Sequence, residues 1–213
     1  MSDSLIVRPA GADESAAIAA ALVRASLDEA VVGWVVPDER DRRDRLDPDD
    51  GTTIEWIRAA ISGSTVLVAG TEQTSVAGLS VWEFDDGTGV PPEVGSAELT
   101  AFFRQAYGEY APRMALVHEL TRRRHPRAEP HWYLQQMVVV PECRGRGLGG
   151  AMLGYQLARA DADRVAAYLE ASSPRNRALY ERYGFRPLGD PIDLPDDGPG
   201  IQPMWRPVTG SPT

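Results

Sequence analysis

A glycine-rich turn in the last third of the chain carries the clearest chemical signal. The apolar run Met137–Val140 is followed by a short polar stretch and then by Arg144-Gly-Arg-Gly-Leu-Gly-Gly150, after which a helix is expected. Glycine permits positive φ and lets the backbone approach a ligand without a Cβ in the way. Consecutive N–H groups at a helix N-terminus point at one spot, where the helix dipole favours an anion. The turn therefore predicts a phosphate or pyrophosphate site, to which Arg144 and Arg146 add positive charge.

The same turn also satisfies the dinucleotide-binding pattern G-x-G-x-x-G. Gly145, Gly147 and Gly150 match it, and Glu170 follows about twenty residues later, where such folds hold the ribose. Three features disfavour this alternative. Pro141–Arg144 separate the glycines from the strand, the motif begins too late for the remaining strands of a doubly wound sheet, and the residues after Glu170 would have no role.

A second motif lies downstream of the turn and changes its interpretation. It consists of two segments, Leu169-Glu-Ala-Ser-Ser-Pro-Arg-Asn176 and Tyr180-Glu-Arg-Tyr-Gly-Phe185. In it, Tyr180 follows Asn176 by four residues, and Gly-Phe follows Tyr180 by four more. Together with Arg-x-x-Gly-x-Gly before a helix, this block resembles the GNAT superfamily of N-acyltransferases over Trp132–Leu188, and within it most resembles the puromycin N-acetyltransferases. The resemblance implies a GNAT fold, an α/β arrangement whose central twisted mixed sheet is flanked by helices and splayed at the acyl-CoA site.

The resemblance also implies acetyl-CoA as cosubstrate. The pantetheine arm would pair, as an added strand would, with the backbone of Val138 and Val140. The amides of the turn would take the pyrophosphate, and Asn176 would contact CoA, with a helix cap or local turn as its alternative role. The residues expected to bind the cosubstrate are Val138, Val139, Val140, Arg144, Gly145, Arg146, Gly147, Leu148, Gly149, Gly150 and Asn176.

The implied reaction is direct acetyl transfer to a primary amine of a small molecule, either a puromycin-like aminonucleoside or another amine, in a ternary complex. Tyr180 is the predicted general acid for the departing thiolate, because a phenol of pKa about 10 stays protonated at neutral pH. Its alternative is packing on the helix face, the role expected of Tyr183. The alternative function is a non-catalytic acyl-CoA-binding or sensor domain, and the presence of Tyr180 argues against it.

The general base is where the chain departs from the family pattern. Many members carry a Glu on the central strand, which here reads Trp132-Tyr-Leu-Gln-Gln-Met137. Glu170, at the end of the next strand, is the predicted base, and its alternative role is to hold the acceptor ammonium. His131 and a water relay are the other candidates. An α-amine of pKa about 7.7–8.0 loses its proton at a cost of only about 1–1.4 kcal/mol and needs little help.

The remaining residues predict neither metal nor nucleophilic chemistry. His118-Glu119 begins like a zincin motif, but Arg122 stands where the second His is needed. His125 and His131 lack ligand spacing, so no metal site is expected. Cys143 has no evident paired base. The acceptor pocket is expected from residues 27–60 and 95–130, with aromatic walls from Trp34, Phe84, Tyr107 and Tyr133.

These residues must be positioned by a mixed order of strands and helices, which predicts one α/β domain over residues 1–213. Within it, a helical insertion over residues 87–130 precedes the motif block over residues 132–188. The predicted strands are Leu5–Arg8, Thr65–Ala69, Ser75–Phe84, Trp132–Val140, Val165–Ala171, Phe185–Leu188 and Ile201–Arg206. The predicted helices are Asp13–Ser26 with Asp13 as its cap, Thr52–Ile61, Gly95–Tyr110, Pro112–Arg123, Gly147–Ala160 and Pro174–Tyr183. Asp38–Asp50 is expected to be a solvated helix face or loop, and Pro191–Pro199 a proline-rich loop.

Composition narrows the function classes. The chain has 213 residues, a net charge of −9 and a pI near 4.9, which disfavours nucleic acid and favours cationic amines as partners. All 22 basic residues are Arg, so Schiff-base chemistry and a P-loop lysine are excluded. Cys143 is the single cysteine, so no intrachain disulfide forms. With no secretory signal and no apolar run long enough to span a membrane, we expect a cytoplasmic protein without a membrane partner, either monomer or homodimer.

Overall fold

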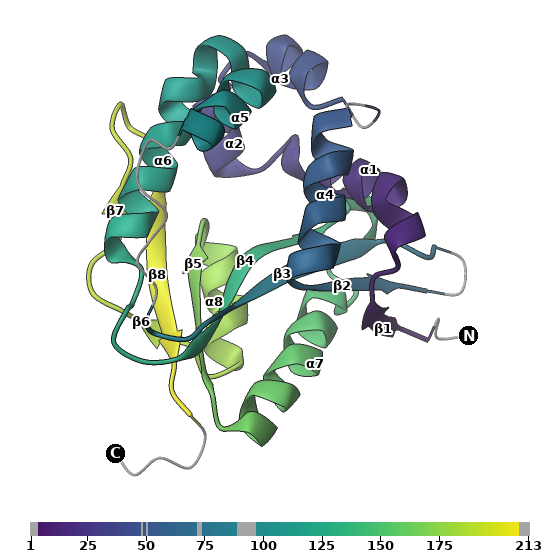
Figure 1. The fold of residues 1–213 in the computed structure, drawn as a ribbon, viewed down its shortest axis with the longest axis vertical. Helices are drawn as coiled ribbons and strands as arrows, with labels where there is room; N and C mark the ends of the chain where they lie inside the picture. The colour runs from purple at the N-terminus through teal and green to yellow at the C-terminus, as the bar shows by residue number, and fades with distance from the viewer. Residues whose placement is uncertain (1–3, 48, 50, 72–73, 89–96, 209–213) are drawn as a thin grey trace.

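The computed structural model describes residues 4–47, 49, 51–71, 74–88 and 97–208. An eight-stranded sheet runs through it in the order β1-β2-β3-β4-β5-β8-β6, with β7 paired to β8 (Figure 1). Only β4 and β5 pair in parallel, so the predicted mixed sheet is confirmed. The strands are β1 (Ile6–Pro9), β2 (Thr65–Gly70), β3 (Gly78–Asp85), β4 (His131–Val139), β5 (Ala166–Ala171), β6 (Arg186–Pro187), β7 (Ile192–Asp193) and β8 (Gly200–Arg206).

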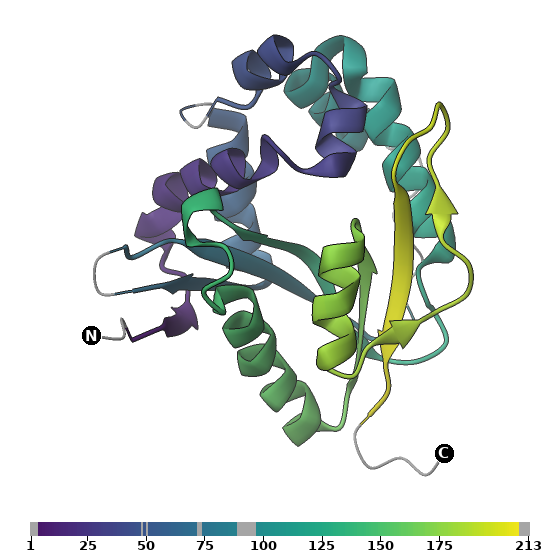
Figure 2. The ribbon, with the colours of Figure 1, turned by 180° about the vertical axis from the view of Figure 1, so that it is seen from behind.

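Helices cover both faces of this sheet. They are α1 (Ser15–Ser26), α2 (Ala30–Val35), α3 (Glu39–Arg45), α4 (Gly51–Gly63), α5 (Ala97–Tyr107), α6 (Ala111–Arg124), α7 (Leu148–Asp163) and α8 (Pro174–Arg182). In Figures 1 and 2, α1 and α4 lie on one side of the sheet, and α7 and α8 lie on the other. The remaining four gather at the top of the view, with α6 reaching down beside β8. Within the described ranges, no helix is long and apolar enough to cross a membrane.

The run of apolar residues in β2 shows why both faces need cover. Val66 and Val68 belong to the core cluster that contains Ile18 of α1, while Leu67 belongs to the cluster that contains Leu153 of α7. Successive side chains of a strand point to opposite faces, so a strand without polar alternation requires helices on both sides. Val66, Leu67 and Val68 are each at most 4% exposed.

Several element boundaries differ from the predictions. Asp13 is not the cap of α1: it lies in a 3-10 turn (Ala12–Glu14), and the N-cap is Glu14. The Glu14 carboxylate is held by the Arg8 guanidinium at 2.6 Å and by the Gly11 N–H at 2.8 Å, which together lower its pKa to about 2. This pairing shapes the turn before α1. In addition, α6 begins at Ala111 with proline in its first turn, and β7 lies inside the predicted proline-rich loop. The predicted start of the preceding helix at residue 95 lies outside the described residues.

The sheet opens between β4 and β5, as the predicted splay requires. The two strands pair only from His131 with Ala166 to Leu134 with Leu169, although β4 continues to Val139. On its other side, β4 shifts register against β3 opposite Val81 and Trp82, where an extra residue enters β4. Such a bulge increases the local twist and turns a strand away from its neighbour. Among the described residues, the second half of β4 therefore has one edge without a strand partner.

Candidate active site

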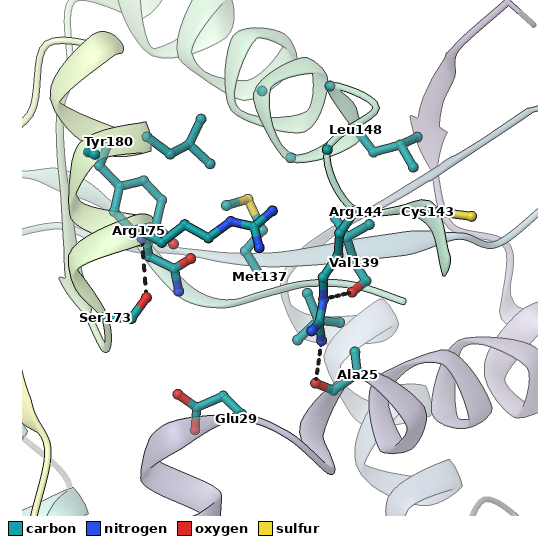
Figure 3. A pocket seen from close by; sticks show the side chains of 18 of the residues that line it. Ala25, Glu29, Met137, Val139, Cys143, Arg144, Leu148, Ser173, Arg175 and Tyr180 are labelled. Atoms are coloured by element: carbon teal, nitrogen blue, oxygen red, sulfur yellow. Dashed lines mark hydrogen bonds between the residues drawn. The ribbon is translucent and has the colours of Figure 1, made fainter. Parts of the chain in front are cut away.

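Two cavities meet at the gap between β4 and β5. The larger, about 790 Å³, lies between the turn before α7 and the first turns of α8 (Figure 3). The smaller, about 430 Å³, lies under α2, α5 and α6. Five residues line both cavities: Glu29, Met137, Val138, Asn176 and Tyr180. The two spaces therefore adjoin at these residues.

The glycine turn has the backbone that the sequence predicts. Gly145 has φ +78°, and Gly147, the N-cap of α7, has φ +89°. Residues other than glycine rarely adopt such positive φ angles. Gly150 serves a different purpose, because a Cβ there would stand 2.6 Å from the hydroxyl of Tyr183. The third glycine thus lets α8 pack against α7, and Tyr183 takes the packing role expected of it. Leu148, 1% exposed, anchors the start of α7 in the core.

Arg144 is held by the protein itself. Its guanidinium pairs with the Asp28 carboxylate and donates to Ala25 O at 3.1 Å, and its Nε donates to Val139 O at 3.0 Å. The Asp28 hydrogen bond raises the pKa of Arg144 and lowers that of Asp28. These contacts tie the glycine turn to the connection between α1 and α2, and Arg144 also lines the larger cavity. Arg146 is exposed and lies outside the lining of the larger cavity.

The first turn of α8 presents two polar side chains to the larger cavity. Ser173 caps the helix by accepting from the N–H of Asn176 at 3.2 Å, with Pro174 in the first turn. Because Ser173 is the cap, the side chain of Asn176 is not needed for capping, and the residue lines both cavities. Arg175 extends from α8 into the larger cavity (Figure 3) and pairs with no carboxylate among the described residues. Arg175 belongs to the Leu169–Asn176 motif, and its role was not predicted from the sequence.

The free edge of β4 differs by one residue from the expectation. The N–H of Val140 donates to Ala77 O at 2.9 Å, so this backbone points toward β3. Backbone groups alternate in direction along a strand, so Val138 also points toward β3. The groups that face the gap belong to Met137 and Val139, and one of them, the Val139 carbonyl, already accepts from the Arg144 guanidinium. Val138 nevertheless lines both cavities.

Tyr180 stands where the two cavities meet, with 5% of its surface exposed. Gly184, with φ +87°, turns the chain after α8 so that the ring of Phe185 packs edge-on against Tyr180 at 6.0 Å. Burial raises the pKa of Tyr180, and the negative charge of Glu29 raises it further. The hydroxyl therefore stays protonated at neutral pH. The four-residue spacing from Tyr180 to Gly184-Phe185 thus places the Phe185 ring against the Tyr180 ring and orients it.

Two carboxylates line the smaller cavity, Glu170, which was predicted from the sequence, and Glu29, which was not. Burial raises the pKa of Glu170 to about 7, and the nearby hydroxyls of Tyr168 and Tyr133 offset part of that effect. Its Oε1 is buried and accepts no hydrogen bond of ordinary geometry from the described residues. Glu29 caps α2 by accepting from the Val32 N–H at 2.9 Å. Its one sequence signal was a carboxylate directly before an apolar helical run, which indicates a cap and not a site.

Some predicted residues lie elsewhere. His131 is fully buried and outside both linings, which removes it as a candidate base. Trp34 packs under the loop before β8, donating from Nε1 to Pro195 O at 3.0 Å, and Phe84 is 52% exposed. Tyr107 and Tyr133 do line the smaller cavity, as expected. Residues from both predicted segments, 27–60 and 95–130, contribute to that lining.

Comparison with known proteins agrees with this architecture. A protein described as histone acetyltransferase HPA2 and related acetyltransferase from Corynebacterium glutamicum matches over 100% of this chain and 99% of its own, at 27% identity and a TM-score of 0.68. An agmatine N-acetyltransferase (17% identity, 95% and 99% covered, TM-score 0.63) and the Drosophila melanogaster polyamine N-acetyltransferase (16%, 96% and 100%, 0.61) share the fold. The family model of the acetyltransferase (GNAT) domain matches residues 62–187. Because this match spans more than half of the chain, the protein belongs to the GNAT acetyltransferases, a family of acyltransferase enzymes.

Proposed function

We propose that the enzyme transfers the acetyl group of acetyl-CoA directly to a primary amine of a small molecule in a ternary complex. The observation that carries this proposal is the meeting of two cavities at Tyr180 and Glu29. Direct transfer requires both substrates to be bound at once with the reacting atoms in contact. Two adjoining spaces, one beside a glycine turn and one lined by carboxylates, supply that arrangement.

The larger cavity is proposed to hold the cosubstrate. The N–H groups at the start of α7 would take the pyrophosphate, in the field of the helix dipole. The pantetheine arm would follow the free edge of β4 beside Met137 and Val139, as an added strand does. Arg175 would supply positive charge for the pyrophosphate, because the charge of Arg144 is paired with Asp28. Asn176, which lines both cavities, would contact the arm near the thioester.

The smaller cavity is proposed to hold an amine with an apolar or aromatic body. Its volume of about 430 Å³ is within the range of about 300–1,000 Å³ typical of small-molecule pockets. Glu29 and Glu170 place negative charge where an ammonium would enter. A puromycin-like aminonucleoside combines these features, and it is the acceptor that we propose first. The aromatic lining consists of Trp56, Phe102, Phe103, Tyr107, Tyr133 and Tyr180.

The proposed step uses one acid and one base. The amine nitrogen attacks the thioester carbonyl carbon, the C–N bond forms and the C–S bond breaks, leaving an amide and the CoA thiolate. Tyr180 protonates the thiolate, and Glu170 accepts the proton that the amine gives up. A pKa of about 7 is suited to this base, since proton transfer is most efficient when the pKa is near the working pH. Glu29, ionised at the N-terminus of α2, would hold the incoming ammonium.

Thiol release from acetyl-CoA against a panel of amines tests this function. We expect turnover with aromatic primary monoamines, puromycin included, with kcat/KM at least about 10-fold above that for spermidine or agmatine, because the largely apolar and aromatic lining would leave a second cation buried without a partner. Glu29→Gln should raise the KM of the amine about 10-fold. No amine-dependent thiol release would refute the proposal, and a preference for polyamines would refute the aromatic acceptor alone.

The role of Arg175 is tested through the cosubstrate. Arg175→Ala should raise the KM for acetyl-CoA about 10-fold with kcat changed less than about two-fold, since a charge-assisted contact made equally in ground and transition states affects binding only. Arg177→Ala is the matched control: Arg177 lies on the same helix but pairs with Glu181 at 3.0 Å. An equal effect of both substitutions would show that general charge, and not a specific contact, is involved.

A further inference from the structure

Three potential metal ligands converge at the end of the sheet away from both cavities. Asp85 is the last residue of β3, and it pairs in register with His131, the first residue of β4. His125, the C-cap of α6, completes the group. The ligand atoms of all three residues lie within 4.8 Å of one another. His125 Nε2 is 3.1 Å from His131 Nε2 and 3.4 Å from Asp85 Oδ2.

The three side chains have more hydrogen-bond acceptors facing one another than hydrogens to donate to them. His131 Nδ1 lies 2.9 Å from Glu129 O, and a carbonyl oxygen only accepts, so Nδ1 carries the hydrogen. In the neutral ring, His131 Nε2 then presents a lone pair to His125. The Asp85 carboxylate is also an acceptor: its Oδ1 accepts from the Gly87 N–H at 2.8 Å, and its Oδ2 faces His125. His125 Nε2 carries at most one hydrogen, so it cannot donate full bonds to both neighbours. A cation between the three atoms would satisfy all of them.

We propose that Asp85, His125 and His131 bind a divalent transition-metal cation, with Zn²⁺ as the best match. Zinc takes imidazole nitrogen and carboxylate oxygen at about 2.0–2.2 Å, which places neighbouring tetrahedral ligands about 3.3 Å apart. The observed separations of 3.1 and 3.4 Å lie on either side of that value. The bond from His131 Nδ1 to a backbone carbonyl is the outer contact that orients metal-binding histidines.

The surroundings suit a site that an ion can reach. His131 is fully buried, whereas the side chains of His125 and Asp85 keep 17% and 29% of their surface exposed. The ion can therefore enter from that side, and a water can complete the coordination. Sequence spacing did not reveal the site because the three ligands come from a strand end, a helix end and a strand start.

The proposed metal site would stabilise one wall of the smaller cavity, which is proposed to hold the acceptor amine. The ring of His125 packs edge-on against Tyr133 at 4.8 Å and against Tyr168 at 4.9 Å. Tyr133 lines the acceptor cavity, and Tyr168 pairs with it across β4 and β5. Metal binding would tie the end of α6 to the sheet beneath these rings. The role is structural, and it does not depend on the proposed acyl transfer.

Metal uptake by the full-length protein tests the proposal. Chelator-treated protein is dialysed and titrated with Zn²⁺ by calorimetry, and with Co²⁺ by visible absorption. We expect one ion per chain, cobalt bands of a tetrahedral or five-coordinate site, and no comparable binding of Mg²⁺, which prefers oxygen ligands. The Tm should rise by about 5 °C or more at free Zn²⁺ one hundred times the Kd. Absence of stoichiometric uptake, or equal binding of Mg²⁺, overturns the site.

Variants assign the ligands. His125→Ala and Asp85→Asn, at partly exposed positions, should each weaken Zn²⁺ binding at least about 100-fold, more than the 10–100-fold typical of outer contacts. His118→Ala is the matched control, because His118 is the remaining histidine and packs against Phe103 instead. It should keep one cobalt ion with an unchanged spectrum. Unaltered affinity in His125→Ala, or loss of cobalt in His118→Ala, contradicts the assignment even if another variant fails to fold.

Discussion

Tyr180→Phe is expected to lower kcat at least about 10²-fold while the KM for acetyl-CoA changes less than about two-fold, because only the proton donor is lost. The CoA thiolate would leave without a nearby acid, and the cavity walls would stay as they are. Burial and the charge of Glu29 both raise the pKa of Tyr180, so the wild-type hydroxyl is fully protonated over the working range. Steady-state thiol release at saturating amine measures the effect.

Tyr183→Phe is the matched control for this prediction. It removes the same hydroxyl three residues later, where the oxygen faces Gly150 and the side chain packs between α7 and α8. The control should keep kcat within about two-fold. Turnover of Tyr180→Phe equal to that of the control would remove Tyr180 from the acid role and leave it as a core residue beneath the cavities.

Glu170→Gln is expected to lower kcat/KM about 10²-fold at pH 8 and to remove the limb of the pH profile near 7. The base must be ionised to accept a proton, so wild-type activity should rise with pH up to the pKa of about 7 and then level off. The titration of the amine adds a second limb that wild type and variant share on the same substrate. If Glu29→Gln removes the limb near 7 and Glu170→Gln does not, the base is Glu29.

The same substitution should stabilise the folded protein at alkaline pH. The folded pKa of Glu170 is raised from 4.5 to about 7, so the native state holds the proton more tightly than the unfolded chain. The associated stability is present below pH 4.5 and is lost as pH rises through about 7. Glu170→Gln avoids that loss, which amounts to about 3 kcal/mol at pH 8, or a Tm higher by several degrees. Thermal unfolding at pH 8 and pH 4.5 checks this: a gain of equal size at both values would contradict ionisation as its cause.

Tyr180 and Glu170 therefore differ in how they affect the stability of the folded protein. Tyr180 is buried as a neutral phenol whose ring belongs to the core, so its function costs little stability. Glu170 must become charged in a buried position, and its Oε1 lacks an ordinary hydrogen bond from the described residues. Residues held ready for chemistry often lower stability in this way.

The sequence alone determined the parts of the site that depend on local backbone. Positive φ at Gly145 and Gly147, and proline in the first turn of α8, follow from which residues tolerate those conformations. Most of the strand and helix order was also predicted, because apolar periodicity is a local property, but the short elements α2 and β7 were missed. The misses at helix starts, such as Glu14 in place of Asp13, came from side-chain pairing that the periodicity does not record.

Only the tertiary structure decided what lies opposite what. Arg144 meets Asp28 across 116 positions of sequence, a pairing that ties the glycine turn to the connection between α1 and α2. Glu29, the N-cap of α2, lines the junction of the two cavities beside residues of β4 and α8, and burial raises the pKa of Glu170. His125 joins Asp85 and His131 only through the pairing of β3 with β4 and the path of α6. Burial, charge pairing and ligand convergence are properties of packed elements, so a linear pattern does not contain them.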